Sequence, residues 1–164
     1  MPSSLSVCHF VNSGSEANEL ALRLAKSHTG GTDFVVIDAA YHGNTGALVD
    51  LSPYKFAGKG GGGKAEHVQV ATLPDSYRGE FGYQDADAGL HYADDVGACF
   101  KKIMERNRKP AAFIAESISG CGGQVVFPDG YLKKAFEHAK AAGALTIADE
   151  VQVGMGRVGS HMWA

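Results

Sequence analysis

Short apolar runs alternate with helical stripes along this chain. Four runs of four or five residues, bounded by glycine, proline or polar positions, predict buried strands at 34–37, 67–71, 111–115 and 144–148. Apolar residues that recur every three or four positions predict helices over 15–28, 92–103 and 132–139. The stripe of the first helix comprises Ala17, Leu20, Ala21, Leu24 and Ala25. This alternation predicts an α/β fold, a three-layer αβα arrangement with a mainly parallel sheet, because crossover helices cover both faces of such a sheet.

Two long irregular stretches, 41–66 and 72–85, are rich in Gly, Pro, Tyr and Asp. Loops of this length are more often functional than idle. Ligands of parallel sheets collect at the carboxyl ends of the strands. We therefore search for chemistry in the residues that follow each predicted strand.

Composition removes several classes of function. The 164 residues carry a formal charge of −3, and no segment gathers the positive charges into a stripe for nucleic acid. No apolar run approaches the roughly 18 residues of a membrane span, and the first residues lack the features of a signal peptide. We therefore expect a cytoplasmic protein without a membrane or nucleic-acid partner. Cys8, Cys99 and Cys121 are widely spaced and predict reduced thiols, and the histidine spacing predicts no metal site.

Two glycine-rich segments imitate nucleotide-binding motifs. Residues 58–64 nearly spell a phosphate-binding loop, but Ala65 replaces its hydroxyl residue and a predicted strand follows instead of a helix. Residues 154–159 fit the dinucleotide fingerprint, but again no helix follows. We interpret the first segment as a surface loop and the second as a tight turn.

The start of the first helix is a candidate phosphate site. Ser13 and Glu16 have the spacing of a capping box, which alone explains this segment. Gly14 and Ser15 additionally place backbone amides and a hydroxyl at the positive end of the helix dipole, where a phosphate dianion binds well. Both interpretations remain open at this point.

Two further strand ends carry candidate ligand-binding residues. Tyr41, His42 and Gly43 follow the first predicted strand, and Asp149 ends the last one, where an unpaired charge is expensive. Asp149 needs a cationic partner, and none lies beside it in sequence. A phosphate site, a stacking aromatic and this carboxylate together fit pyridoxal 5′-phosphate, whose ring nitrogen must stay protonated.

Four motifs in order resemble the class III aminotransferase family, of fold type I. They are NSGSEANE at 12–19, YHG at 41–43, ESISGCGG at 116–123 and DEVQVGMGRVG at 149–159, and they span essentially the whole chain. The resemblance implies that Gly14 and Ser15 bind the cofactor phosphate, Tyr41 stacks on the pyridine ring and Asp149 pairs with its nitrogen. The candidate cofactor-binding residues are Ser13, Gly14, Ser15, Tyr41, His42, Glu116, Asp149, Val151 and Gln152.

The third motif departs from the pattern EPxxGEGG that is usual in the family. Ser117 and Cys121 replace its Pro and its second Glu. With LSPYKF at 51–56 and PDSYRG at 74–79, this departure looks like the phospho-lyase branch, which removes phosphate from phosphorylated amines. An ω-aminotransferase that passes an amino group to a keto acid is the alternative.

The resemblance also implies parts that these 164 residues do not contain. We expect residues 1–164 to be a partial PLP-binding large domain, without the family's N-terminal segment, Schiff-base lysine region or C-terminal small domain. This chain alone should therefore lack turnover, whereas the full-length form should be a homodimer. A non-catalytic binding or dimer-forming module is the second class of function that the sequence leaves open.

Overall fold

A four-stranded parallel sheet forms the centre of the computed structural model, which describes residues 5–163. Its strands lie in the order β2-β1-β3-β6, and each pairing is parallel. Their bounds are β1 Asp33–Ile37, β2 Val68–Ala71, β3 Pro110–Glu116 and β6 Leu145–Asp149. The four predicted strands and the parallel arrangement are thus confirmed.

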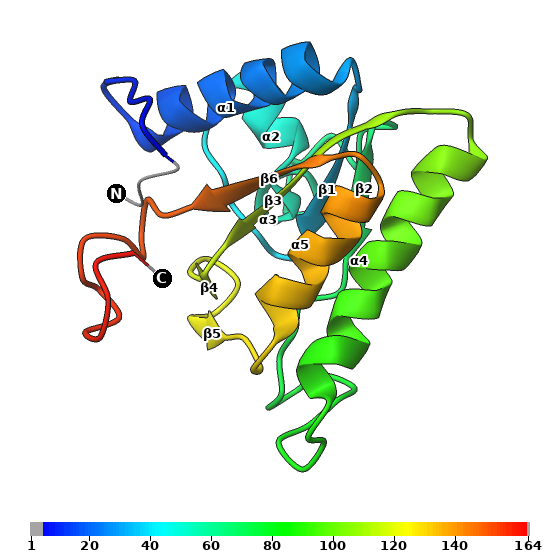
Figure 1. Ribbon diagram of the computed structural model, residues 1–164, viewed down its shortest axis with the longest axis vertical. Helices are drawn as coiled ribbons and strands as arrows, with labels where there is room; N and C mark the ends of the chain where they lie inside the picture. The colour runs from blue at the N-terminus through cyan, green and yellow to red at the C-terminus, as the bar shows by residue number, and fades with distance from the viewer. Residues whose placement is uncertain (1–4, 164) are drawn as a thin grey trace.

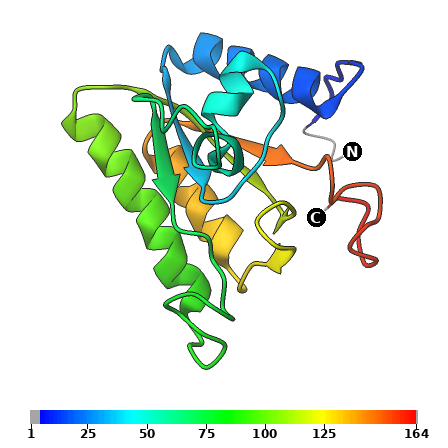
Figure 2. The same cartoon turned by 180° about the vertical axis from the view of Figure 1, so that it is seen from behind.

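Helices cover both faces of this sheet (Figures 1 and 2). The first helix, α1 Gly14–Thr29, lies on one face together with the short α2 Gly46–Asp50. The long helices α4 Ala88–Glu105 and α5 Tyr131–Ala141 pack side by side against the other face. The three-layer αβα fold is therefore confirmed.

Alternate strand residues point into two separate cores. Val35, Ile37 and Phe113 are buried against α4 and α5, whereas Phe34 and Ile114 belong to the cluster under α1 and α2. This is the period-2 alternation of side chains along a strand. Both faces of the central strands are apolar for this reason, which explains their uninterrupted hydrophobic sequence.

The predicted face of the first helix was only partly right, because Ala25 is buried but Ala17 and Leu24 are exposed. Its buried residues are Asn18, Leu22, Ala25 and Thr29. Leu24, which we assigned to the apolar stripe, is 49% exposed. Two polar residues occupy the buried face because they make hydrogen bonds there: Asn18 to the site described below, and Thr29 to the carbonyl oxygen of Ala25.

The stretch 41–66 is less irregular than we expected, because it contains α2 and a further turn of helix, α3 Pro53–Phe56. Thr45 caps α2, and Pro53 starts α3, where a missing amide hydrogen costs nothing. The hydrophobic pattern also did not predict two short antiparallel strands, β4 Ile118–Ser119 and β5 Val125–Val126. Strands of two residues are too short to produce a period.

Both glycine-rich segments have the conformations that we predicted. Residues 58–64 form a loop between α3 and β2, and residues 154–159 form consecutive turns after β6. The three cysteines are free thiols. Within the described range 5–163, no helix has the length and apolar character needed to cross a membrane.

Phe113, at the centre of β3, provides a test of this core. Its side chain is fully buried and packs edge-to-face on Phe136 at a centroid distance of 6.0 Å. Phe113→Ala should lower the free energy of unfolding by about 3–5 kcal/mol, measured by urea denaturation, because a cavity replaces the ring. Leu24→Ala, on the exposed side of α1, should change it by no more than about 0.5 kcal/mol. Equal losses would show that Phe113 does not belong to the core.

Candidate active site

The carboxyl ends of three strands surround a cavity of about 160 Å³. The structure brings together there every candidate residue that the sequence suggested. The lining residues are Ser13, Gly14, Ser15, Tyr41, His42, Gly43, Glu116, Asp149, Val151 and Gln152. Ser15 and Asp149 thus face one cavity, although they lie far apart in sequence.

The amino end of α1 forms one wall of the cavity. The Ser13 hydroxyl accepts a hydrogen bond from the Glu16 amide at 3.1 Å and so caps the helix. The Ser15 hydroxyl accepts from the Asn44 amide at 3.1 Å, which leaves its own hydrogen free to donate. A Cβ atom on Gly14 would come within 2.6 Å of Val151, so glycine is needed where α1 meets the residues after β6. This wall offers backbone amides, a hydroxyl and a helix dipole to an anion.

The loop after β1 forms the adjoining wall of the cavity with Tyr41, His42 and Gly43. Gly43 has a φ of 138°, and a Cβ atom there would lie 2.7 Å from the Ser15 hydroxyl oxygen. Glycine is therefore required for the loop to approach α1 so closely. Tyr41 packs edge-to-face on Tyr54 at 6.1 Å, with the Lys55 ammonium 5.5 Å from the centre of its ring.

The Asp149 carboxylate is buried and accepts three hydrogen bonds, which leaves one of its roughly four acceptor sites available. Its Oδ2 accepts hydrogen bonds from His42 Nδ1 and Asn18 Nδ2, both at 2.8 Å, and its Oδ1 accepts from the Val151 amide at 3.1 Å. Burial alone would raise the pKa of Asp149, but the bonds from His42, Val151 and Asn18 outweigh it and lower the pKa. The carboxylate is therefore held in its charged form, and His42 supplies the partner that no sequence neighbour offered.

His42 itself is fixed from several sides. Its amide donates to the Ser52 hydroxyl at 3.0 Å, and its carbonyl accepts from Asn18 at 2.9 Å. Since an ionised carboxylate has no proton to give, His42 Nδ1 is the donor to Asp149. The other ring nitrogen, Nε2, is buried and has no hydrogen-bond partner within residues 5–163. A buried polar atom without a partner is costly, and a polar group entering the cavity could remove that cost.

A second carboxyl group lies beside the first. Glu116 pairs with Asp149 in the β3–β6 register and is buried, with both oxygens 3.3 Å from the Gly120 amide. Burial, reinforced by the charge of Asp149, raises the pKa of Glu116. The two environments thus drive the pKa values of neighbouring carboxyl groups in opposite directions, a feature typical of functional sites.

Our sequence reasoning missed two residues that hold the site together, Asn18 and Ser52. Asn18 occupies the buried face of α1, and Ser52 precedes Pro53 and donates to the Leu48 carbonyl oxygen at 2.6 Å. A polar residue one turn before Leu22 was the available signal for Asn18. Ser52 gave no such signal, because its partners come from the fold of the 41–66 segment.

Comparison with known proteins decides the family. The family model described as "Aminotransferase class-III" matches residues 2–164. The chain belongs to this family. Among class III aminotransferases it is 50% identical to an alanine–glyoxylate aminotransferase 2-like protein of Drosophila melanogaster, over 100% of the chain and 34% of that protein. It is 42% identical to ethanolamine-phosphate phospho-lyase homolog 1 of Caenorhabditis elegans, over 94% of the chain and 35% of that protein.

Solved structures share the fold. A phospholyase from Arthrobacter in complex with phosphoethanolamine superposes with a TM-score of 0.81 at 35% identity, over 93% of this chain and 35% of that one. The taurine:2-oxoglutarate aminotransferase of Bifidobacterium kashiwanohense, in complex with PLP and glutamate, gives 0.76 at 26% identity, over 93% and 34%. The chain thus spans about a third of the length of these relatives.

The Asp149 pair predicts how stability responds to acid. A carboxyl group whose pKa is lowered by folding stabilises the fold above its unfolded pKa of about 3.9, and that contribution disappears as the pH falls through the folded pKa. His42→Gln removes the strongest of the interactions that lower the pKa of Asp149. The midpoint of acid unfolding, followed by circular dichroism, should therefore move to higher pH.

The matched control is His91→Gln. His91 makes the same 2.8 Å contact with Asp85, but on the exposed surface. This substitution should leave the acid midpoint nearly unchanged. If both variants moved the midpoint equally, burial would not increase the contribution of the His42–Asp149 pair to acid stability.

Proposed function

We propose that the protein binds pyridoxal 5′-phosphate in the cavity at the carboxyl ends of β1, β3 and β6 and uses it to transform an amine substrate. The observation that carries this proposal is that one cavity presents an anion-binding wall and a negatively charged carboxylate together. The anion-binding start of α1 and the ionised Asp149 lie on the same small cavity, with Tyr41 in its wall. A molecule with a phosphate, a flat ring and a cationic nitrogen matches these groups.

Each wall of the cavity would have one task. The amides of Gly14 and Ser15 and the Ser15 hydroxyl would hold the phosphate, and Tyr41 would stack on the ring. Asp149, kept charged by His42 and Asn18, would hold the proton on the ring nitrogen. Bound pyridoxal phosphate supplies an electron sink that lets an amine substrate lose a group at its α-carbon. Glu116, with its raised pKa, and the amide of Gln152 line the same cavity and would offer the cofactor further polar contacts.

For the reaction itself we propose phospho-lyase chemistry. The substrate loses a proton from its α-carbon, and its β-carbon–oxygen bond breaks, so that the bonding electrons leave with inorganic phosphate. The remaining product takes up water and yields an aldehyde and ammonia. Support comes from the similarity to the phospho-lyase homolog and to the Arthrobacter phospholyase, and from Cys121 in place of the second Glu of the family pattern.

Amino transfer to a keto acid is the second candidate. The 50% identity to an alanine–glyoxylate aminotransferase 2-like protein favours it specifically. Both reactions would begin with the same proton loss and would use the same cofactor contacts. The difference lies in what leaves the substrate, so product analysis separates them.

The proposal extends to parts outside this chain. The cavity of about 160 Å³ is smaller than the roughly 300–1,000 Å³ of a complete small-molecule site. We assign the remaining walls, including the Schiff-base lysine, to other segments of the full-length protein. We also propose a homodimer, supported by exposed apolar side chains such as Phe10 and the cavity-lining Val151.

Full-length protein with its cofactor should release phosphate and ammonia from phosphoethanolamine without a keto acid. The 164-residue chain alone should release neither, because this proposal assigns the Schiff-base lysine to another segment of the full-length protein. Colorimetric phosphate and coupled ammonia assays measure both products. Amine transfer to pyruvate with the phosphate retained would instead establish an aminotransferase, and turnover by the short chain would contradict the assignment of the lysine.

Asp149→Asn tests the cofactor contact directly. This isosteric change removes the charge but keeps the side-chain shape, so the affinity of the full-length protein for pyridoxal phosphate should fall at least about tenfold, or about 1.4 kcal/mol. An absorbance titration measures the dissociation constant. Asp85→Asn, which removes a half-buried aspartate with the same histidine contact outside this cavity, should change it less than about twofold. Unchanged affinity in Asp149→Asn would refute the proposed pairing.

A further inference from the structure

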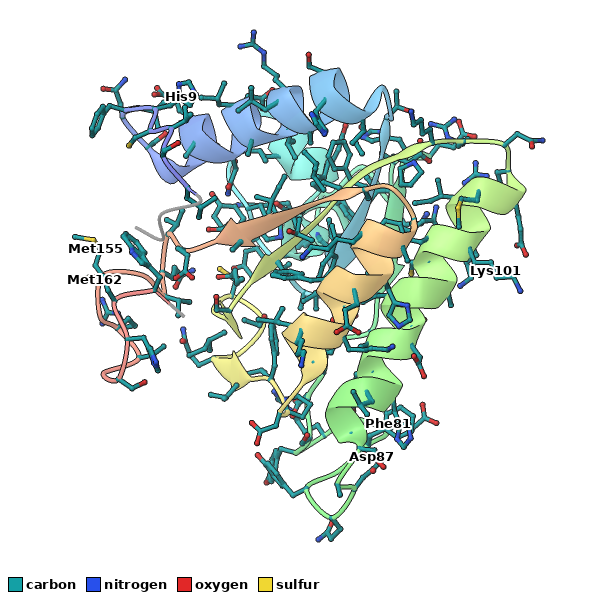
Figure 3. All side chains as sticks on the ribbon, in the orientation of Figure 1. His9, Phe81, Asp87, Lys101, Met155 and Met162 are labelled. Carbon is teal, nitrogen blue, oxygen red and sulfur yellow. The ribbon has the colours of Figure 1, made fainter. Side chains whose placement is uncertain are left out.

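A second cavity of about 430 Å³ adjoins the first. The two cavities share Val151 and Gln152 as lining residues. The second one lies between the turns after β6 and the β4 strand with the turn that joins it to β5, which face each other in Figure 1. Met155 and Met162 project from the outer side of the same turns (Figure 3), so they leave this space to other residues.

The second cavity has the polarity of an anion site. Arg157 is its one charged lining residue, and no carboxylate lines it within residues 5–163. Arg157 forms no ion pair with any carboxylate of that range. Its guanidinium is therefore available to an incoming anion, and its planar fork suits phosphate.

A third cavity, of about 520 Å³, makes a useful contrast. Asp75, Asp85 and Asp129 line it, and its cation, Arg78, is already paired with Asp75 at 3.0 Å. An anion would meet repulsion there. Of the two large spaces, only the one that adjoins the proposed cofactor cavity has an unopposed positive charge.

Gln152 forms the partition between the two adjoining cavities. Its side chain packs against Gly120, where a Cβ atom would come within 2.7 Å of Nε2, and Nε2 lies 3.9 Å from Cys121 Sγ. The amide thus contacts residues of the ESISGCGG segment. A substrate whose amine reaches the first cavity past Gln152 would extend its other end into the second.

We propose that this second cavity receives the phosphate of a phosphorylated amine substrate and that Arg157 is the residue that selects it. The assignment rests on the proposed function, because it places the reacting amine in the first cavity. Arg157 would bind the phosphate in the substrate and stabilise the charge on the same group as it leaves. Gln152 and Gln124 would donate further hydrogen bonds from the cavity wall.

Calorimetric titration of the full-length, cofactor-loaded protein tests this assignment. Arg157→Gln should raise the dissociation constant of phosphoethanolamine, and of inorganic phosphate as a competing probe, at least about tenfold. The dissociation constant of alanine, an unphosphorylated amine, should change less than about twofold. Arg157→Lys should recover part of the loss, because it keeps the charge but not the fork. Retention of the cofactor absorbance band verifies that each variant is folded.

The matched control is Arg106→Gln. Arg106 pairs with Glu66 at 2.6 Å at the end of α4, away from the residues of all three cavities, and its removal should leave all three affinities unchanged. Lys55→Gln tests the alternative that Lys55, the cation next to Tyr41, binds the phosphate instead. Loss of phosphoethanolamine binding in Lys55→Gln but not in Arg157→Gln would overturn the assignment.

Two other results would also overturn it. Equal losses for phosphoethanolamine and alanine in Arg157→Gln would show a general carboxylate or anion contact instead of phosphate selection. Wild-type protein that binds neither phosphoethanolamine nor phosphate would exclude the subsite altogether. By contrast, Arg157-dependent binding of phosphoethanolamine without phosphate release would support the subsite and refute only the lyase reaction.

Discussion

The buried charge of Asp149 is the constraint on which the rest of the site depends. A carboxylate removed from water loses several kcal/mol of solvation, and only paired hydrogen bonds offset that loss. Asp149 has three, from His42, Asn18 and the Val151 amide, and bonds to charged groups contribute about 1.5–3 kcal/mol each. These donors come from the loop after β1, from α1 and from the chain after β6. One charge thus fixes three segments relative to one another.

The parallel sheet makes this convergence possible. Because β1, β3 and β6 run in the same direction, the residues that follow them meet at one edge. The register sets Glu116 beside Asp149, and their surroundings drive the two pKa values apart. One carboxyl group is therefore suited to a cation, and the other to a neutral hydrogen-bonding partner. The helix start at Gly14 adds the positive end of a dipole, so that one small cavity presents both signs of charge.

Much of this arrangement was readable from the sequence, since buried parallel strands are continuous apolar runs. All four strands of the sheet and the three long helices were predicted, and so was the set of residues that lines the cavity. The buried face of α1 was predicted only in part, because Asn18 and Thr29 are polar residues buried for their hydrogen bonds. The partner of Asp149 was hidden for a related reason. His42 lies 107 positions away, and only the strand order brings the two together.

The proposed cofactor contact can be observed directly by NMR of pyridoxal phosphate labelled with ¹⁵N in its ring and bound to the full-length protein. The account predicts a protonated ring nitrogen at neutral and mildly alkaline pH, with a signal that shifts toward the unprotonated position when Asp149 is replaced by Asn. An unprotonated ring nitrogen in the wild-type protein over that range would contradict it.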